Sequence, residues 1–273
     1  MPSRPGISTR LVWRALDILD FVLAVPLNVV VPRHVRFRWS APGTVLRNRR
    51  GFDEVMRLVE TGRRPLVLDV GGGLAALKDL PGAAERMWIV TLDIDMALLG
   101  RARRKVPDSV LVCGDGTLLP FADDTFDVVV MVHALEHIAE QIRPALVNEI
   151  KRVSRRGVVI HGPAGRDAIE LARQFIDALE ARGGAAPRYA VEHLEFPMPM
   201  PEWLNETFPG CVLQPRRNLK VELETLLMAY TPVLRWFSGY KNRQLAAADD
   251  KPPFVEYTMT WRKPAASGRS TLA

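Results

Sequence analysis

The residues best suited to bind a charged ligand begin at Asp69, which is followed by Gly71 and Gly73 at the end of the apolar run 66–70. Glycines let the backbone approach a ligand closely, because no side chain intervenes and a positive φ costs little. The N–H groups at the start of a following helix would donate further hydrogen bonds to the ligand. A carboxylate at Asp69 would repel a pyrophosphate and attract a positive charge. This turn therefore predicts a site for a ligand that carries a cationic group.

Two further carboxylates follow the next two apolar runs of the chain. Asp93 comes about twenty residues after the glycines, the distance at which a carboxylate can bond ribose hydroxyls. Asp115 stands between two glycines, where it could accept a hydrogen bond from an adenine amino group. The glycine spacing with Ala76 also satisfies a dinucleotide fingerprint. A nucleotide-dependent oxidoreductase using NAD(P) is therefore one alternative, and a non-catalytic nucleotide-binding protein is another.

These residues must be positioned by strands that alternate with helices. Such alternation implies crossover connections and an α/β, Rossmann-like, doubly wound sheet of seven mostly parallel strands. The expected strands are residues 66–70, 88–92, 110–113, 126–132, 157–160, 211–214 and 254–261. The expected helices are residues 11–31, 52–60, 74–80, 96–105, 138–153, 167–181 and 202–208, with a helical insertion before the last strand.

The order of these motifs resembles the class I S-adenosylmethionine-dependent methyltransferases, in particular their small-molecule branch. The matching segments are residues 68–73, 92–96, 114–116 with 119–121, 125–129, 135–138 and 149–157. The resemblance implies S-adenosylmethionine as cofactor. It places the cofactor-binding residues at Asp69, Gly71, Gly73, Asp93, Ile94, Asp115 and Gly116. The first three would surround the methionine part, Asp93 the ribose, and the last three the adenine.

The resemblance also places His133 beside the transferred methyl group and the acceptor. A histidine with a near-neutral pKa suits a hydroxyl acceptor, because it can take the hydroxyl proton. His133 is therefore the candidate catalytic residue. Glu136 and His137 are interpreted as capping or packing groups, and His161 and His193 as residues at the edge of the pocket.

The resemblance therefore predicts an S-adenosylmethionine-dependent methyltransferase acting on a small molecule, with oxygen as the favoured acceptor atom. The chain lacks an Asn/Asp-Pro-Pro-aromatic turn at residues 132–135, which argues against a nucleic-acid substrate. The apolar insertion suggests a lipid-linked or glycan acceptor. The expected organisation is a basic N-terminal extension (1–64), a methyltransferase domain (65–263) with its insertion at 218–245, and a flexible tail (264–273).

The net charge of +6 on 273 residues is concentrated in the N-terminal quarter. Residues 1–64 contain 12 arginines and 5 acidic residues, so the remainder of the chain is close to neutral. Residues 11–50 therefore predict a peripheral contact with an anionic membrane, or else a helix that packs on the domain. Asp17, Asp20 and Pro26 interrupt the apolar run 15–31 and disfavour a spanning helix. Two distant cysteines, without a CxxC spacing, predict a cytoplasmic protein with no metal site.

Overall fold

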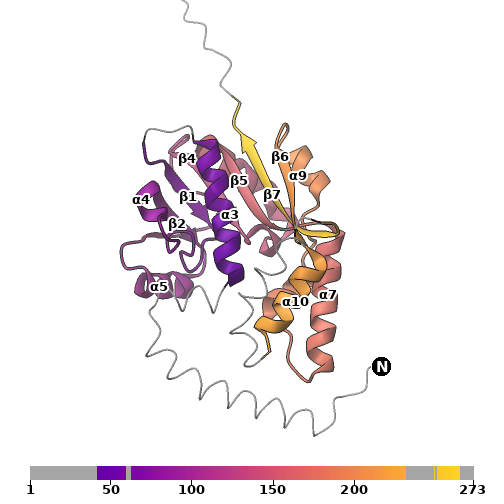
Figure 1. The fold of residues 1–273 in the computed structure, drawn as a ribbon. Helices are drawn as coiled ribbons and strands as arrows, with labels where there is room; N and C mark the ends of the chain where they lie inside the picture. The colour runs from indigo at the N-terminus through magenta and orange to yellow at the C-terminus, as the bar shows by residue number, and fades with distance from the viewer. Residues whose placement is uncertain (1–41, 60–62, 232–248, 250, 265–273) are drawn as a thin grey trace, which may run out of the picture.

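The computed structural model describes residues 42–59, 63–231, 249 and 251–264, and a seven-stranded sheet forms its centre (Figure 1). The strands are β1 (Leu66–Val70), β2 (Trp88–Asp93), β3 (Val110–Cys113), β4 (Phe126–Val132), β5 (Ser154–Pro163), β6 (Val212–Asn218) and β7 (Phe254–Arg262). Their order is β3-β2-β1-β4-β5-β7-β6. The pairs among β1 to β5 are parallel, whereas β7 is antiparallel to both β5 and β6. The predicted Rossmann-like α/β fold is confirmed.

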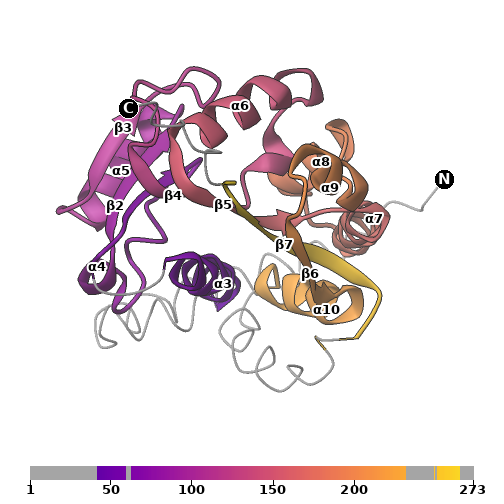
Figure 2. The same ribbon diagram turned by 90° about the horizontal axis from the view of Figure 1, so that it is seen from above.

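Helices cover both faces of this sheet (Figure 2). On one side lie α3 (Pro42–Leu58), α4 (Ala83–Arg86) and α10 (Leu219–Ala229); on the other lie α6 (Arg143–Val153), α8 (Arg188–Glu195) and α9 (Pro201–Thr207). The remaining helices are α5 (Met96–Lys105) and α7 (Arg166–Ala181), with short 3₁₀ turns η1 (Leu135–His137) and η2 (Glu140–Ile142). Helix α7 packs beside both α8 and α10.

Alternation along the central strands divides the apolar core into two layers. On β1, Val67 packs with Phe52 and Val55 of α3, whereas Leu68 packs with Ile150 of α6 on the opposite face. Full burial of a side chain of this kind stabilises the fold by about 1.5–3 kcal/mol. Helix α3 therefore supplies part of the core, although it precedes the first strand in the sequence.

The predicted helix at residues 74–80 is wrong, because these residues form consecutive turns. The physical reason is backbone conformation: Gly71, Gly73 and Ala75 all have positive φ, and a right-handed helix cannot begin through such residues. The first helix on this connection is α4, which starts only after Gly82. The helix expected from residue 138 is also shorter than predicted, since α6 begins at Arg143 after the 3₁₀ turn η2.

Two expectations fall wholly or partly on residues that the structure does not describe. The helix predicted at residues 11–31 lies outside the described residues, as do residues 232–245 of the predicted insertion. The start of that insertion is α10.

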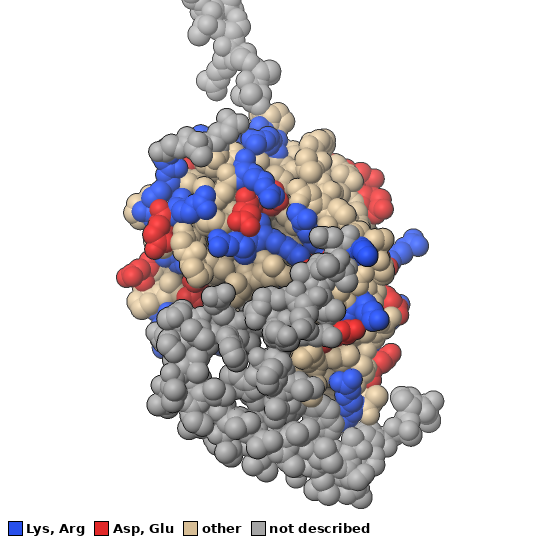
Figure 3. Space-filling view, viewed as in Figure 1, with Lys and Arg blue, Asp and Glu red and all other residues tan. Residues whose placement is uncertain are grey.

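Lys and Arg side chains are prominent on the face of the molecule on which α3 lies (Figure 3). Among the described residues, no helix is sufficiently long and apolar to cross a membrane. The domain boundaries and the membrane contact stay predictions.

Candidate functional site

The turn after β1 is built from glycines that no other residue could replace without strain. Gly71 has φ +71° and Gly73 has φ +47°, both in the left-handed region. A Cβ on Gly71 would lie 2.6 Å from the Cβ of Ala134, well inside van der Waals contact. The Gly71 N–H donates to the carbonyl of Leu92 at 2.8 Å, which fixes the turn to the end of β2. The backbone of this turn is thus held at the carboxyl edge of the sheet.

Asp69 lies beneath this turn as a buried carboxylate with an unused acceptor. Its side chain is 2% exposed, and its Oδ2 atom has no hydrogen-bond partner among the described residues. A Cβ on Gly72 would clash with that Oδ2, so the carboxylate sits directly against the glycine backbone. Burial, together with the charge of Asp93, raises the pKa of Asp69 to about 7. A bound cation would relieve this unfavourable charge.

Asp93 stands at the end of β2 and ties the glycine turn to the start of α5. Its Oδ2 accepts from the N–H of Gly73 at 2.8 Å, and its Oδ1 accepts from the N–H of Asp95 at 2.9 Å. Each carboxylate oxygen can accept a second hydrogen bond, so capacity remains for ligand hydroxyls. Ile94, the next residue, is 73% exposed, and Leu118 is 79% exposed. Such exposed apolar side chains at a strand edge could pack against an aromatic ring.

Asp115 and Gly116 follow β3 at the same edge. The exposed carboxylate of Asp115 accepts from the N–H and the Oγ1 of Thr117, both at 2.8 Å, and these hydrogen bonds lower its pKa. A Cβ on Gly116 would lie 2.8 Å from a methyl group of Leu146, so a larger residue here would require the Leu146 side chain to move. The structure therefore brings all the predicted cofactor-binding residues to the carboxyl edge of β1, β2 and β3. Their roles stay predictions.

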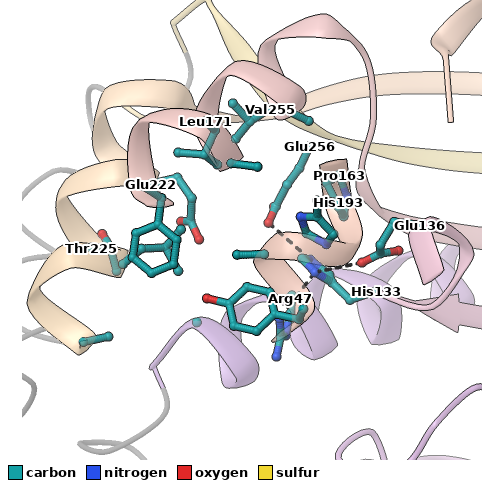
Figure 4. A pocket seen from close by; sticks show the side chains of 18 of the residues that line it. Arg47, His133, Glu136, Pro163, Leu171, His193, Glu222, Thr225, Val255 and Glu256 are labelled. Atoms are coloured by element: carbon teal, nitrogen blue, oxygen red, sulfur yellow. Dashed lines mark hydrogen bonds and ion pairs between the residues drawn. The ribbon is translucent and has the colours of Figure 1, made fainter. Parts of the chain in front are cut away.

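A cavity of about 600 Å³ opens beside this edge (Figure 4). Its apolar wall includes Leu171 and Phe175 of α7, Leu226 of α10 and Val255 of β7. Its polar wall includes Arg47, His133, Glu136, His137, Tyr189, His193, Glu222 and Glu256. The cavity thus combines an apolar wall with a wall of ionisable side chains. His133 lies between the cavity and the carboxyl edge of β1 to β3, which we call the cofactor edge for the role predicted there, because it directly follows β4, the neighbour of β1.

His133 is held firmly in a strained backbone conformation. It has φ +50°, which is uncommon for a residue other than glycine, and its N–H donates to the carbonyl of His161 at 2.8 Å. Its Nε2 lies 3.2 Å from Oε1 of Glu256, and its Nδ1 lies 3.3 Å from Nη1 of Arg47. Burial and the charge of Arg47 lower the pKa of His133. A neutral imidazole at this position can accept a proton.

Glu256 is a central acid of the cavity, and the sequence did not reveal it. Its Oε2 accepts from Nη1 of Arg50 at 3.0 Å and lies 3.5 Å from Nε2 of His161. Burial raises the pKa of Glu256, but contacts with His133, His161 and Arg50 outweigh burial and hold this pKa well below its usual range. Glu256 reaches the site because β7 is antiparallel, so the start of β7 lies against the end of β5 at Pro163.

Of the other histidines predicted at the pocket edge, His193 lines the cavity and is partly buried, whereas His161 is fully buried and is not among the lining residues. Nδ1 of His161 lies 3.0 Å from Oγ1 of Thr258, and burial lowers the pKa of both His161 and His193 to about 3. Glu136 and His137, which were interpreted as capping or packing groups, instead line the cavity. Burial raises the pKa of Glu136 to about 8. The convergence of these groups was missed because they are far apart in the chain.

Comparison with known proteins confirms the resemblance to S-adenosylmethionine-dependent methyltransferases over residues 68–161, which match the family model described as "Methyltransferase domain". A demethylmenaquinone methyltransferase of Streptomyces avermitilis is 32% identical over 104 residues, which are 38% of this chain and 44% of that protein. A protein of the same name from Mycobacterium bovis is 38% identical over 92 residues, 33% of this chain and 37% of that one. The chain thus matches less than half the length of these curated relatives.

A solved structure agrees with the fold over a larger part of the chain. An S-adenosylmethionine-dependent methyltransferase from Archaeoglobus fulgidus superposes with a TM-score of 0.53 and 14% identity. The superposition covers 81% of this chain and 94% of that one. At this identity the likeness concerns the fold, and the seven-stranded sheet described above accounts for it.

Proposed function

We propose that this protein transfers the methyl group of S-adenosylmethionine to a small-molecule acceptor bound in the cavity beside His133. The observation that carries the proposal is the buried carboxylate of Asp69, which has an unpartnered oxygen directly beneath the glycine turn. When bound, the cofactor would supply a methyl group on a positively charged sulfur. The matched methyltransferase segment, residues 68–161, contains both the turn and His133.

The cofactor-binding residues each have a suitable chemical role. Asp69 would neutralise the positive end of the cofactor, next to the open backbone of Gly71 and Gly73. Asp93 retains acceptor capacity for ribose hydroxyls after its two backbone hydrogen bonds. The exposed Ile94 would cover one face of the adenine, and Asp115 would accept from its amino group beside Gly116.

The cavity favours an acceptor with an apolar body and a hydroxyl group. Leu171, Phe175 and Leu226 provide the apolar wall, which suits a lipid-like or aromatic body better than a glycan. His133 would take the hydroxyl proton on Nδ1, in place of its contact with Arg47, and Glu256, 3.2 Å from Nε2, would stabilise the imidazolium that results. Methyl transfer is an in-line displacement, so alignment and the exclusion of water would supply much of the acceleration. The curated relatives, named for demethylmenaquinone, support a small-molecule acceptor.

Two features argue against the NAD(P)-dependent alternative. The carboxylate of Asp69 would lie against the pyrophosphate of a dinucleotide and repel it, because no ion pair joins Asp69 to a Lys or Arg among the described residues. Residues 74–80 form turns, so the long helix whose N-terminus would bind that pyrophosphate is not formed there. Measuring the release of S-adenosylhomocysteine distinguishes the proposal from a non-catalytic role, because a protein that only binds the cofactor would release none.

Calorimetric titration with S-adenosylmethionine and S-adenosylhomocysteine tests the proposal. We expect binding of both, and a loss in affinity of about 10- to 100-fold in Asp93→Ala, since hydrogen bonds to a charged group contribute about 1.5–3 kcal/mol. Asp108→Ala is the matched control, because Asp108 is an exposed carboxylate away from the site. Absence of binding, or equal affinity of Asp93→Ala and the wild type, would refute the assignment.

A further inference from the structure

A second group of potential ligands lies in the polar wall of the cavity, apart from the cofactor edge. Glu136 and His137 come from η1, and His193 comes from α8, which packs against η1. Each of the three residues offers one ligand atom, and these atoms all lie within 4.8 Å of one another. Ligand atoms around a tetrahedral zinc ion are about 3.4 Å apart. Small side-chain rotations would therefore bring these three atoms around one ion.

Two polar atoms of this group, one on Glu136 and one on His193, lack a hydrogen-bond partner among the described residues. Oε1 of Glu136 and Nε2 of His193 are buried and accept or donate no hydrogen bond among the described residues. Glu136 is 2% exposed, and its ion pairs within the described part of the chain are with histidines, none with Lys or Arg. A buried carboxylate without a cation is costly. Arg47 and Arg143 act on Glu136 electrostatically without pairing with it, so a bound metal ion would supply a directly bound cation together with the missing partners.

His137 lies between two carboxylates, those of Glu136 and Glu192. Its Nδ1 lies 3.0 Å from Oε2 of Glu192, while its Nε2 faces Oε1 of Glu136 at 3.9 Å. Metal-ligating histidines commonly donate their second ring N–H to a carboxylate, which fixes the ring and the tautomer. Glu192 would have this role, leaving Nε2 of His137 free for an ion. The ring of His193 lies 5.3 Å from that of His137, centroid to centroid.

We propose that Glu136, His137 and His193 form a binding site for a divalent first-row transition metal such as Zn²⁺. Two histidines and one carboxylate are a known donor set for such ions, and three protein ligands leave a coordination position open. All three residues line the cavity, so the open position faces the space for the acceptor. An oxygen of the acceptor would occupy it, and this last assignment rests on the function proposed above.

A neighbouring group of His133, His161 and Glu256 is less suited to an ion, although its ligand atoms are equally close. Its carboxylate is already paired with Arg50 at 3.0 Å, so a metal ion would lie beside a guanidinium. Nδ1 of His161 already contacts Thr258. An ion bound by the first group should be lost when His193 is substituted, and an ion bound by the second group when His161 is substituted. The test below uses this difference.

The experiment is a zinc titration of the full chain without an affinity tag, after removal of metals with a chelator. We expect one Zn²⁺ per chain, and a Kd at least tenfold weaker in both Glu136→Gln and His193→Gln. Glu192→Gln should weaken the Kd by about tenfold, as substitutions of such orienting carboxylates do. Glu195→Gln, an exposed carboxylate on α8, is the matched control and should bind zinc as the wild type does.

His161→Gln distinguishes between the two groups. The proposal would be overturned if zinc affinity fell in His161→Gln but persisted in His193→Gln. It would also be overturned if the wild type bound zinc no more tightly than Glu136→Gln and His193→Gln do. His193 is only partly buried on α8, so its variant should fold even where Glu136→Gln does not. Thermal unfolding of each variant would confirm folding. Zinc binding is measured without S-adenosylmethionine, so failure of the proposed function leaves this result unaffected.

The open coordination position has a separate readout. Co²⁺ in place of Zn²⁺ gives visible d–d absorption that depends on the number and type of ligands. Acetohydroxamate, a small oxygen ligand, should change this spectrum in the wild type if one position faces the cavity. An unchanged spectrum would overturn the assignment of an open position.

Discussion

Replacement of Asp69 by Asn should stabilise the protein without cofactor and at the same time remove most of its affinity for S-adenosylmethionine. Asp69 is buried, Oδ2 has no hydrogen-bond partner among the described residues, and its pKa is raised from 3.8 to about 7. A shift of about three pKa units corresponds to about 4 kcal/mol of unfavourable free energy for the charged form. This figure is an upper limit, because a more polarisable surrounding would reduce it.

The pH dependence of this effect has a definite sign. Because the pKa of Asp69 is higher in the folded than in the unfolded protein, the folded state holds the proton more tightly between pH 4 and 7. Its contribution to the free energy of unfolding is fully present below pH 4 and is lost as the pH rises through 7. The neutral amide of the Asp69→Asn variant does not titrate and loses nothing over this range. The stability advantage of the variant should therefore grow with pH and reach its full size near pH 8.

Urea unfolding of Asp69→Asn and the wild type at pH 5 and pH 8 measures this difference directly. Other titrating groups are the same in both proteins and cancel in the comparison. Saturating S-adenosylmethionine should then stabilise the wild type and leave the variant nearly unchanged, because the amide cannot neutralise the cofactor. A stability difference independent of pH, or a variant that binds the cofactor as tightly as the wild type, would refute the reasoning.

Three further predictions concern backbone strain, the buried acid and the first described helix. Gly71→Ala should destabilise the protein by about 1–3 kcal/mol, because its Cβ would lie 2.6 Å from that of Ala134 at a positive φ. Gly82→Ala is the control: Gly82 also has a positive φ but open space around it, so this variant should lose less stability in the same thermal unfolding experiment. Glu256→Gln should reduce the free energy of unfolding by about 1.5–3 kcal/mol, because it removes a charged hydrogen bond with Arg50 while Asp249 still pairs with that guanidinium; urea titration measures this, and an unchanged midpoint would contradict it. Removal of residues 1–58, which include α3, should prevent folding, as measured by circular dichroism. Removal of residues 1–41 alone should preserve cofactor binding but abolish sedimentation with anionic vesicles, if those residues contact anionic lipids.

The strands, and the meeting of the three aspartates at one edge of the sheet, could be predicted from the sequence because both depend on short segments. A buried parallel strand is a continuous apolar run, and Asp69, Asp93 and Asp115 each stand at or just after the end of such a run. Parallel strands then bring these ends to one edge of the sheet. The helix expected at residues 74–80 failed because the positive φ of Ala75 depends on the packing of the turn and leaves no trace in composition.

The acceptor side could not be predicted in the same way, because its residues meet only through tertiary contacts. Glu256 lies in an alternating strand and reaches the cavity through the antiparallel pairing of β7 with β5. His193 comes from α8, a helix that the sequence pattern did not indicate. Arg50 pairs with Glu256 from a helix more than two hundred residues earlier in the chain. Registers and helix docking of this kind have no local sequence pattern.

The cavity draws its walls from a different part of the chain than the cofactor edge does. Of the described residues that line it, His133, Glu136 and His137 lie within the segment 68–161, and the others come from α3, α7, α8, α10, β5 and β7, with Tyr230 directly after α10. If the proposed function holds, changes in the peripheral helices could alter the acceptor without changing the segment proposed to bind the methyl donor. The same division offers a route to engineering: grafting α7 and α8 onto a related core should transfer acceptor preference along with His193.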